Sequence, residues 1–537
     1  MGNAVFQRRL AGALIVLIGV FSGAIVLYST FWGPWVKTDS VAYFQAAQNL
    51  LLGHGLTIAQ ASGDYAPLSL HPPLYSATLA LIGLVSGDML EAARWLGVVL
   101  VGATSMALGF AILNLLGDSL AAILLSLVFA SSPSILHVHS GAMSEPLFFF
   151  AAFVSIFLAI AYVRDSRRLY LFSAAILLSA ALLSRYVAVS AVLTTALVVA
   201  FFGSFKFKRR IADAAFLITI AFTPFVIWRV TLAISLLETP ALTGSLSPAR
   251  LWSVLEPVRG VLVDTVWNWT AFSILPLQLH YRDKLILFVL VSLVLSSLVI
   301  IAAKRARISD PQSWYRCPEF TLLVASVVFI VSYILFFSLS FLVLNLKLNL
   351  AARLFAPLWL ALLLALLAGY SFIVKGQTRN LFSRVALLLG AALFLIPNLI
   401  ATPKMVDRLH REGEGFTGQF WRNSDLIREV KSMPPAVPLL SNETAAILFL
   451  TGRPAYDMQV VISPVMSDQA MQFGEDPTDP ARPVFRERRG ALVLFNSIYW
   501  QLWPKFGSRT QDRLDNLVHG LQLQTEGHDG AIYFFKR

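Results

Sequence analysis

Long apolar runs are the feature that most constrains this chain. About eleven runs of near membrane-spanning length lie within the first 401 residues. Only 13% of the 537 residues are charged, roughly half of what a soluble fold uses to coat its surface. The sequence therefore predicts an all-α polytopic membrane domain and excludes a disordered chain, a coiled coil and a disulfide-rich scaffold. The runs cover residues 10–32, 93–115, 119–136, 146–163, 169–184, 187–202, 211–232, 285–303, 319–344, 354–374 and 381–401.

Basic residues gather in the loops on one side of these spans. With a cytoplasmic N-terminus, the inner loops collect the clusters at 8–9, 164–168, 206–210, 304–316 and 375–384. This bias predicts a multi-pass protein of the plasma or inner membrane, with the N-terminus inside. It also accounts for much of the net charge of +12, so nucleic-acid binding is unnecessary.

Three segments do not read as spans, and all three fall on the outer face in this topology. We expect residues 1–401 to form the transmembrane domain, with outer loops at 33–92 and 233–284. We expect residues 402–537 to form an α/β domain outside the cytoplasm, because strand-like and helical stretches alternate there. The strand-like stretches are 437–441, 491–495 and 531–535, and the helical ones are 424–432 and 444–450.

The first outer loop holds an acidic and a basic candidate. Asp39 follows the first span closely, where an ionisable group is costly unless it has a function or pairs with another polar group. The alternative is an N-cap for a helix from Ala42 to Leu52. His71 precedes Pro72, so it is held extended beside a helix start, a geometry that suits an anion such as phosphate. The alternative there is a simple turn.

Further candidates lie at later outer helix ends. His137, His139 and Glu145 are close enough in sequence to suggest metal ligands, and the alternative is that Ser144 or Glu145 caps the next helix. Arg185 and Arg353 interrupt the positive-inside pattern. They could hold a lipid phosphate bidentately, or merely reach to headgroups.

These motifs together resemble the GT-C superfamily of membrane glycosyltransferases. In particular they look like the bacterial group of protein O-mannosyltransferases and aminoarabinose transferases. The matching stretches run over essentially the whole chain. They are Thr38-Asp39 to Tyr43, Ala47 to Gly55, His71-Pro-Pro-Leu-Tyr75, Ser144-Glu145-Pro-Leu, Ser184-Arg185-Tyr186, Arg353-Leu-Phe-Ala-Pro357, Leu440-Ser-Asn-Glu443 and Thr451-Gly-Arg453-Pro454.

The resemblance implies transfer of a sugar from a polyprenyl-phosphate donor to an acceptor at the outer face of the membrane. Asp39 would be the catalytic base, although Ser40 stands where many relatives have a second acidic residue. Glu145 would help to form the catalytic site, and the donor phosphate would meet His71, Arg185 and Arg353. Further site candidates are Tyr43, His54, His139 and Tyr186.

The chemistry of these residue types agrees with that expectation. Inverting transfer needs a carboxylate to take a proton from the acceptor and cations to stabilise the departing phosphate. The arginines supply those cations, so we expect no required cofactor, and a divalent metal remains an alternative. The sugar, hexosyl or pentosyl, and the acceptor, whether lipid, glycan, polysaccharide or protein, stay open. A transporter or flippase of a lipid-linked substrate, and a catalytically silent scaffold, are the rival functions.

Overall fold

The computed structural model of the chain divides it into two compact units, which we describe separately. The first comprises residues 1–30, 69–75 and 92–410, and the second comprises 31–68, 76–91 and 411–537. The structure describes all residues except Met1, 203–204, 237–247, 269–280, 309–316, 345–351, 375–380, 459–489, Gly520 and 536–537. Parts of the predicted loop 233–284 and of two predicted basic clusters therefore lie outside the described residues.

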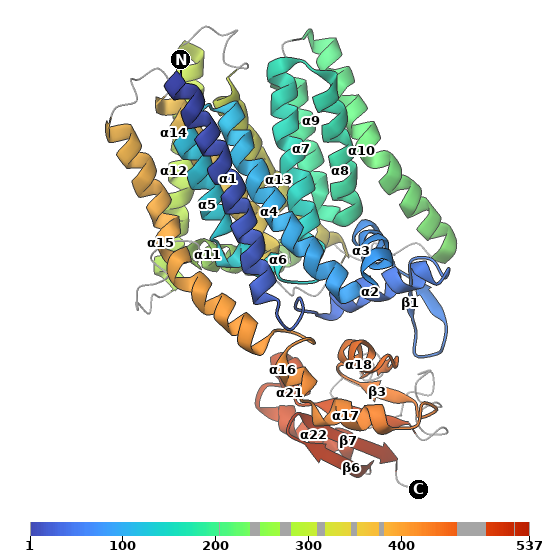
Figure 1. The fold of residues 1–537 in the computed structure, drawn as a ribbon. Helices are drawn as coiled ribbons and strands as arrows, with labels where there is room; N and C mark the ends of the chain where they lie inside the picture. Colours follow the sequence, from blue (N-terminus) through green and yellow to red (C-terminus); the bar gives the residue numbers. More distant parts are fainter. Residues whose placement is uncertain are drawn as a thin grey trace. The chain divides into compact units, whose positions relative to one another are not determined.

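The first unit is built of helices (Figure 1). Its apolar sequence favours helices, because backbone N–H and C=O groups inside a bilayer must form their hydrogen bonds within the same segment. Two short 3₁₀ helices, η1 (Tyr186–Ala188) and η4 (Ala352–Phe355), precede longer helices. The α-helices are α1 (Gly2–Ser29), α4 (Met89–Leu115), α5 (Ser119–Ala130), α6 (Pro133–His139), α7 (Glu145–Asp165), α8 (Arg168–Ser184), α9 (Val189–Phe202), α10 (Phe207–Leu236), α11 (Pro248–Asn268), α12 (Tyr281–Ile308), α13 (Pro318–Leu344), α14 (Ala356–Val374) and α15 (Leu381–Glu412).

All eleven predicted spans coincide with helices of this unit. Among the described residues, seven helices are long and apolar enough to cross a membrane. An eighth span results if the bent pair α5 and α6 counts as one, and α8 and α9 are shorter apolar helices. The span predicted at 119–136 is thus not one straight helix, because the chain bends by 61° before Pro133. Proline suits the first turn of a new helix but not the interior of an old one.

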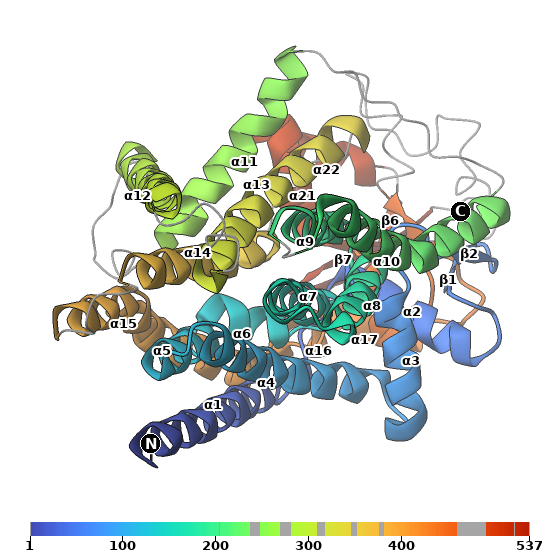
Figure 2. The ribbon, with the colours of Figure 1, turned by 90° about the horizontal axis from the view of Figure 1, so that it is seen from above.

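Close packing joins the helices of the first unit. Figure 2 shows α7, α8, α9 and α10 side by side, and α13 packs against α9 and α14. The side chains between them form one continuous apolar core. At Gly97 of α4, an added Cβ would lie 2.2 Å from the carbonyl oxygen of His139. Glycine is therefore needed where α4 meets the end of α6.

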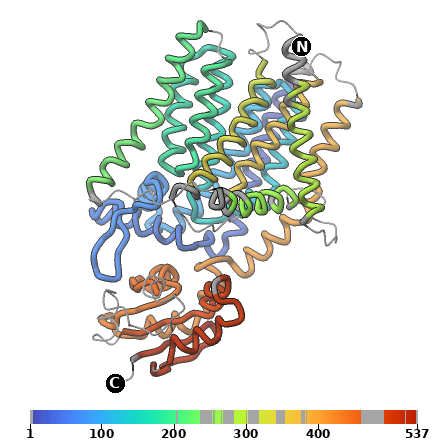
Figure 3. The backbone as a smooth tube through the Cα atoms, turned by 180° about the vertical axis from the view of Figure 1, so that it is seen from behind, coloured from blue at the N-terminus to red at the C-terminus, as the bar shows by residue number. Residues whose placement is uncertain are grey.

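Helix α11 does not follow the direction of the bundle. It runs across it, as Figures 1 and 3 show. It lies against α12 and α13, and Lys284 of α12 forms a 2.7 Å ion pair with Asp264 of α11. This helix belongs to the segment 233–284 that was expected not to span the membrane.

The second unit combines helices with a five-stranded sheet. The strand order is β4-β3-β5-β7-β6, in which β3 is parallel to β4 and β5, while β7 is antiparallel to β5 and β6. A separate hairpin pairs β1 with β2. The strands are β1 (Thr57–Ala59), β2 (Tyr65–Pro67), β3 (Leu439–Ser441), β4 (Tyr456–Asp457), β5 (Ala491–Phe495), β6 (Leu521–Gly527) and β7 (Gly530–Phe535). The helices are α2 (Thr38–Leu51), α3 (Leu74–Ser86), α16 (Gln419–Arg422), α17 (Asp425–Ser432), α18 (Thr444–Thr451), α21 (Ser497–Phe506) and α22 (Thr510–Val518), with η6 (Gly507–Arg509) between the last two.

The mixed sheet confirms the α/β character expected for the tail. Arg453 and Glu443, from the two motifs of the tail, form hydrogen bonds within this unit. Arg453 donates hydrogen bonds to four carbonyl groups, those of Val430, Met433, Pro434 and Val437. Glu443 accepts hydrogen bonds from Ser497 (2.6 Å) and Gln501 (2.9 Å), so it ties β3 to the start of α21.

The segment after the first helix packs with the tail inside this second unit. Phe416 donates its backbone N–H to the Val36 carbonyl at 2.8 Å, and Phe44 of α2 stacks on Phe449 of α18 at 6.0 Å. At Gly415, φ is +64° and an added Cβ would lie 2.2 Å from the Val36 oxygen, so only glycine fits. The predicted boundary between residues 401 and 402 stays a prediction.

Candidate functional site

A buried carboxylate between two arginines is the main polar feature of the first unit. Arg185 Nη1 lies 2.9 Å from Glu145 Oε2, and Arg353 Nε lies 3.6 Å from Glu145 Oε1. The Glu145 side chain is only 3% exposed, while the two arginines keep 22% and 19% of their surface exposed. We call these three residues the arginine–glutamate cluster. The structure thus brings together three of the residues that the sequence analysis gave as site candidates.

Helix ends position each member of this cluster. Glu145 begins α7, directly before Pro146 in the first turn, where a carboxylate is favoured by the helix dipole. Arg185 is the C-cap of α8 and has an extended backbone (φ −152°, ψ 137°). Arg353 lies in η4, immediately before α14. All three side chains therefore come from points at which the chain leaves or enters a helix.

The cluster consists of ion pairs rather than aligned hydrogen bonds. Although Arg185 approaches Glu145 to 2.9 Å, neither carboxylate oxygen accepts a hydrogen bond within the described part of the chain. A buried carboxylate without hydrogen bonds is costly unless its charge is compensated. Its lone pairs remain available to a hydroxyl group of a ligand.

Two further side chains support the cluster: Ser144, which the sequence suggested only as a helix cap, and Tyr333, to which the sequence did not point. Ser144 accepts a 3.3 Å hydrogen bond from Arg185 Nη1. Tyr333 of α13 is buried and donates a 2.6 Å hydrogen bond to the carbonyl oxygen of Leu354, the residue after Arg353. A tyrosine hydroxyl inside an apolar span needs an acceptor, and this was the only signal that could have identified Tyr333.

His71 and Tyr186 also belong to the first unit. His71 is half-buried in the segment 69–75. Tyr186 opens η1, next to Arg185, and donates a 3.3 Å hydrogen bond to the carbonyl oxygen of Ser69. Tyr186 thus follows Arg185 in the chain and is hydrogen-bonded to the segment that contains His71.

His139 has a different environment, inside the apolar core. It is 1% exposed, its Nδ1 lies 2.8 Å from the Ile135 carbonyl oxygen, and its ring contacts Phe129 and Phe149. Glu145 is paired with arginines rather than with this imidazole. The arrangement of these residues therefore does not favour the metal site considered for His137, His139 and Glu145.

The remaining sequence candidates lie in the second unit. Asp39 is half-buried in the first turn of α2, and Tyr43 of the same helix is 1% exposed. Asp39 is not the N-cap considered from the sequence, because that position belongs to Lys37, whose backbone N–H donates to Ser40 Oγ at 3.2 Å. His54 is exposed and stacks on Tyr65 of the β1–β2 hairpin, with ring centroids 4.5 Å apart.

One possible metal-ligand group exists among the described residues, in the second unit. Asp425, His528 and Asp529 offer ligand atoms within 4.8 Å of one another. Each already has a protein partner: His528 Nδ1 lies 2.7 Å from Asp425, and Asp529 accepts from Ser424 Oγ and from the Leu426 backbone N–H. The hydrogen bond with His528 lowers the pKa of Asp425, and the same bond raises the pKa of His528. This group fastens the start of α17 to the β6–β7 turn.

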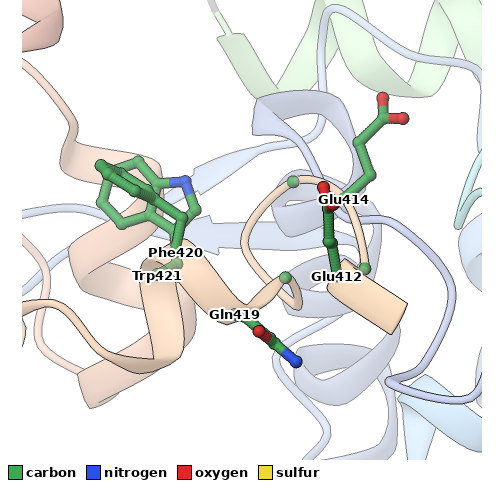
Figure 4. A pocket seen from close by; sticks show the side chains of 8 residues that line it. Glu412, Glu414, Gln419, Phe420 and Trp421 are labelled. Carbon is green, nitrogen blue, oxygen red and sulfur yellow. The ribbon is translucent and has the colours of Figure 1, made fainter. Parts of the chain in front are cut away.

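A cavity of about 310 Å³ lies beside the glycine-rich loop at 412–418 of the second unit. Glu412, Glu414, Gln419, Phe420 and Trp421 contribute to its lining (Figure 4). The labelled side chains do not converge on one point, since Gln419 extends away from Glu414 and the aromatic rings lie on the other side of the loop. Glu414 is also paired with Lys37 at 3.2 Å. The polar groups here are thus not arranged around a common ligand.

Comparison with known proteins identifies the fold. No family model and no curated protein matches the chain. Among solved structures, it is similar to ArnT from Cupriavidus metallidurans in the apo state, with a TM-score of 0.55 and 12% identity over 98% of each chain. It is also similar to the same enzyme bound to undecaprenyl phosphate, with a TM-score of 0.53 and 12% identity over 97% of each chain. The chain has the GT-C fold.

The GT-C fold confirms the fold class that the sequence motifs implied. Together with the apolar helices, it makes this chain a multi-pass membrane protein. The likeness extends over both the helical unit and the tail, since it covers nearly the full length of both chains.

Proposed function

We propose that this protein is a glycosyltransferase that moves a sugar from a polyprenyl-phosphate donor to an acceptor at the outer face of the membrane. The observation that carries the proposal is the arginine–glutamate cluster on a GT-C fold. ArnT, which shares this fold, has been solved with undecaprenyl phosphate bound. A donor of the same chemical class fits the residues of the present cluster.

The charge of the cluster supports a phosphate ligand. Two guanidinium groups face a single carboxylate, so the cluster carries one net positive charge. A phosphodiester that links a sugar to a polyprenyl chain carries one negative charge. Arginine binds phosphate oxygens through paired N–H donors, and a fixed cation stabilises the charge that grows on a departing phosphate. Arg185 and Arg353 would therefore bind the donor phosphate, with His71 beside them.

The remaining roles follow from the chemistry of inversion. Asp39 would take the proton from the acceptor nucleophile as it attacks the anomeric carbon, and the lipid phosphate would leave from the opposite face. Glu145 would hold the two arginines in place and accept a hydrogen bond from a sugar hydroxyl. Tyr43, His54, His139 and Tyr186 stay candidates for supporting roles in the same site.

The orientation is also part of the proposal. The basic clusters support a cytoplasmic N-terminus in the plasma or inner membrane, and with that orientation residues 402–537 would lie outside the cytoplasm. The donor would carry a hexose or a pentose, and the acceptor would be a lipid, a glycan or a protein.

Arg185→Ala tests the phosphate-binding role. We expect its affinity for undecaprenyl phosphate to fall about tenfold or more, because charge-assisted hydrogen bonds to the phosphate are lost. Affinity can be measured by ligand-induced thermal shift of the purified full-length protein in detergent. Arg167→Ala is the matched control, since it removes an exposed arginine from the opposite end of the same helix. Equal affinities of Arg185→Ala and Arg167→Ala for undecaprenyl phosphate would indicate that Arg185 only contacts lipid headgroups.

Chelation tests the expectation that no metal is needed. If the arginines stabilise the leaving phosphate, sugar transfer should continue at an unchanged rate in excess EDTA. The rate is followed as release of polyprenyl phosphate. A loss of activity that manganese, magnesium or zinc restores would contradict this and require a metal in the site.

A further inference from the structure

Another arginine lies on α10, outside the arginine–glutamate cluster. Arg229 stacks on its neighbour Trp228, with the guanidinium carbon 5.6 Å from the ring centroid. Its guanidinium also lies beside the hydroxyl of Tyr186. The side chain is half-buried. Arg229 lies inside the candidate span Phe207–Ile234, in the half that the expected topology puts toward the outer face, so it departs from the positive-inside pattern as Arg185 and Arg353 do.

Aromatic packing fixes the surroundings of Arg229. The Tyr186 ring lies 6.0 Å from Phe225 and 6.2 Å from Trp228, both of α10, and Phe225 lies 5.8 Å from Trp228. Tyr186 in turn donates its hydrogen bond to Ser69. The rings around Arg229 are therefore packed against one another, which limits the entropy that they would lose on binding a ligand.

The charge of Arg229 is not balanced as that of the other two arginines is. Arg185 and Arg353 share Glu145, whereas no carboxylate forms an ion pair with Arg229 in the part of the chain that the structure describes. A half-buried cation on an aromatic face, without a carboxylate, is a favourable position for an incoming anion. Tyr186 directly follows Arg185, so one peptide bond links this position to the cluster along the chain.

From this geometry we propose that Arg229, Tyr186 and Trp228 form a second anion-binding subsite, which takes a phosphate or carboxylate group. Arg229 adds one positive charge with which Glu145 forms no ion pair. The second anion would come either from the polyprenyl carrier or from a separate acceptor that bears an acidic group. The inference rests on the proposed function only for the identity of the neighbouring ligand.

Inorganic phosphate is a suitable probe, because it needs no knowledge of the acceptor. The full-length protein in a phosphorus-free maltoside detergent is titrated with inorganic phosphate, without and with saturating undecaprenyl phosphate, while the ³¹P line width of inorganic phosphate is followed. We expect saturable broadening in wild type, about tenfold weaker binding in Arg229→Gln, and intermediate binding in Arg229→Lys, which keeps the charge but loses the planar guanidinium. Arg209→Gln should leave phosphate binding unchanged; it removes an arginine that stacks on Phe205 at 3.5 Å but is paired with Asp213 at 3.8 Å.

A parallel titration with undecaprenyl phosphate identifies the source of the anion. If Arg229→Gln weakens binding of that lipid, and saturating lipid abolishes the Arg229-dependent binding of inorganic phosphate to wild type, the subsite serves the carrier. If it weakens only inorganic phosphate in the lipid-saturated protein, the subsite serves an acidic acceptor. Unchanged binding of both probes in a folded Arg229→Gln protein would overturn the proposal. Neither titration involves turnover. A failure of the subsite proposal can therefore be distinguished from a failure of the proposed sugar transfer.

Discussion

Sugar transfer by Asp39→Asn should fall at least about a hundredfold below wild type, because a positioned general base contributes roughly 10² to 10⁴ in rate. Asparagine keeps the size of the side chain but cannot take up a proton. The backbone start of α2 should remain intact, since Ser40 rather than Asp39 caps the Lys37 amide. The measurement is the rate of polyprenyl phosphate release by the two purified proteins.

The control for this variant is Asp64→Asn. Asp64 is an exposed aspartate in the same unit, in the turn that joins β1 to β2. The same chemical change there should leave both the rate and the melting temperature at wild-type values. If Asp39→Asn kept more than about a tenth of the wild-type rate, Asp39 would not be the base.

Glu145→Ala should lower the free energy of unfolding by about 3 kcal/mol, because it leaves two arginines without their shared carboxylate. The value is at the low end for a buried pair, since the arginines keep 22% and 19% of their surface exposed to water. The expected observation is a clearly lower melting temperature of the ligand-free protein. Undecaprenyl phosphate should restore part of the loss by supplying a negative charge to the arginines.

A double-mutant cycle separates charge compensation from simple packing. If the loss in Glu145→Ala comes from uncompensated cations, Glu145→Ala with Arg185→Ala should be no less stable than Glu145→Ala alone. Additive losses in the double mutant would show instead that Glu145 acts mainly by filling space.

The helices could be predicted from the sequence because one physical requirement dominates them. A backbone in lipid must satisfy its own hydrogen bonds, so each apolar run becomes a helix wherever it occurs. The break between α5 and α6 shows the limit of this reasoning, since an apolar run does not reveal where Pro133 begins a new direction. Strand β6 was missed because much of Leu521–Gly527 is exposed, so the strand has no continuous apolar run to predict it.

The site was predictable as a set of residue types but not as an arrangement. Glu145, Arg185 and Arg353 each stand out as charges at helix ends, yet the sequence could not show that the two arginines share one carboxylate. Tyr333 and Arg229 were missed because their neighbours in space, Leu354 and Tyr186, lie far from them along the chain. His139 looked like a ligand beside Glu145, and only the packing of Phe129 and Phe149 places it in the core.

The most direct test of the account is the release of free polyprenyl phosphate from a panel of radiolabelled polyprenyl-phosphate sugars by the full-length protein in lipid. We predict that wild type releases lipid phosphate from at least one sugar donor, and that Asp39→Asn releases almost none. That result would establish the donor class and identify the sugar. If folded wild-type protein released no lipid phosphate from any donor, even with extracted envelope lipids and glycans supplied as acceptors, the glycosyltransferase proposal would be contradicted.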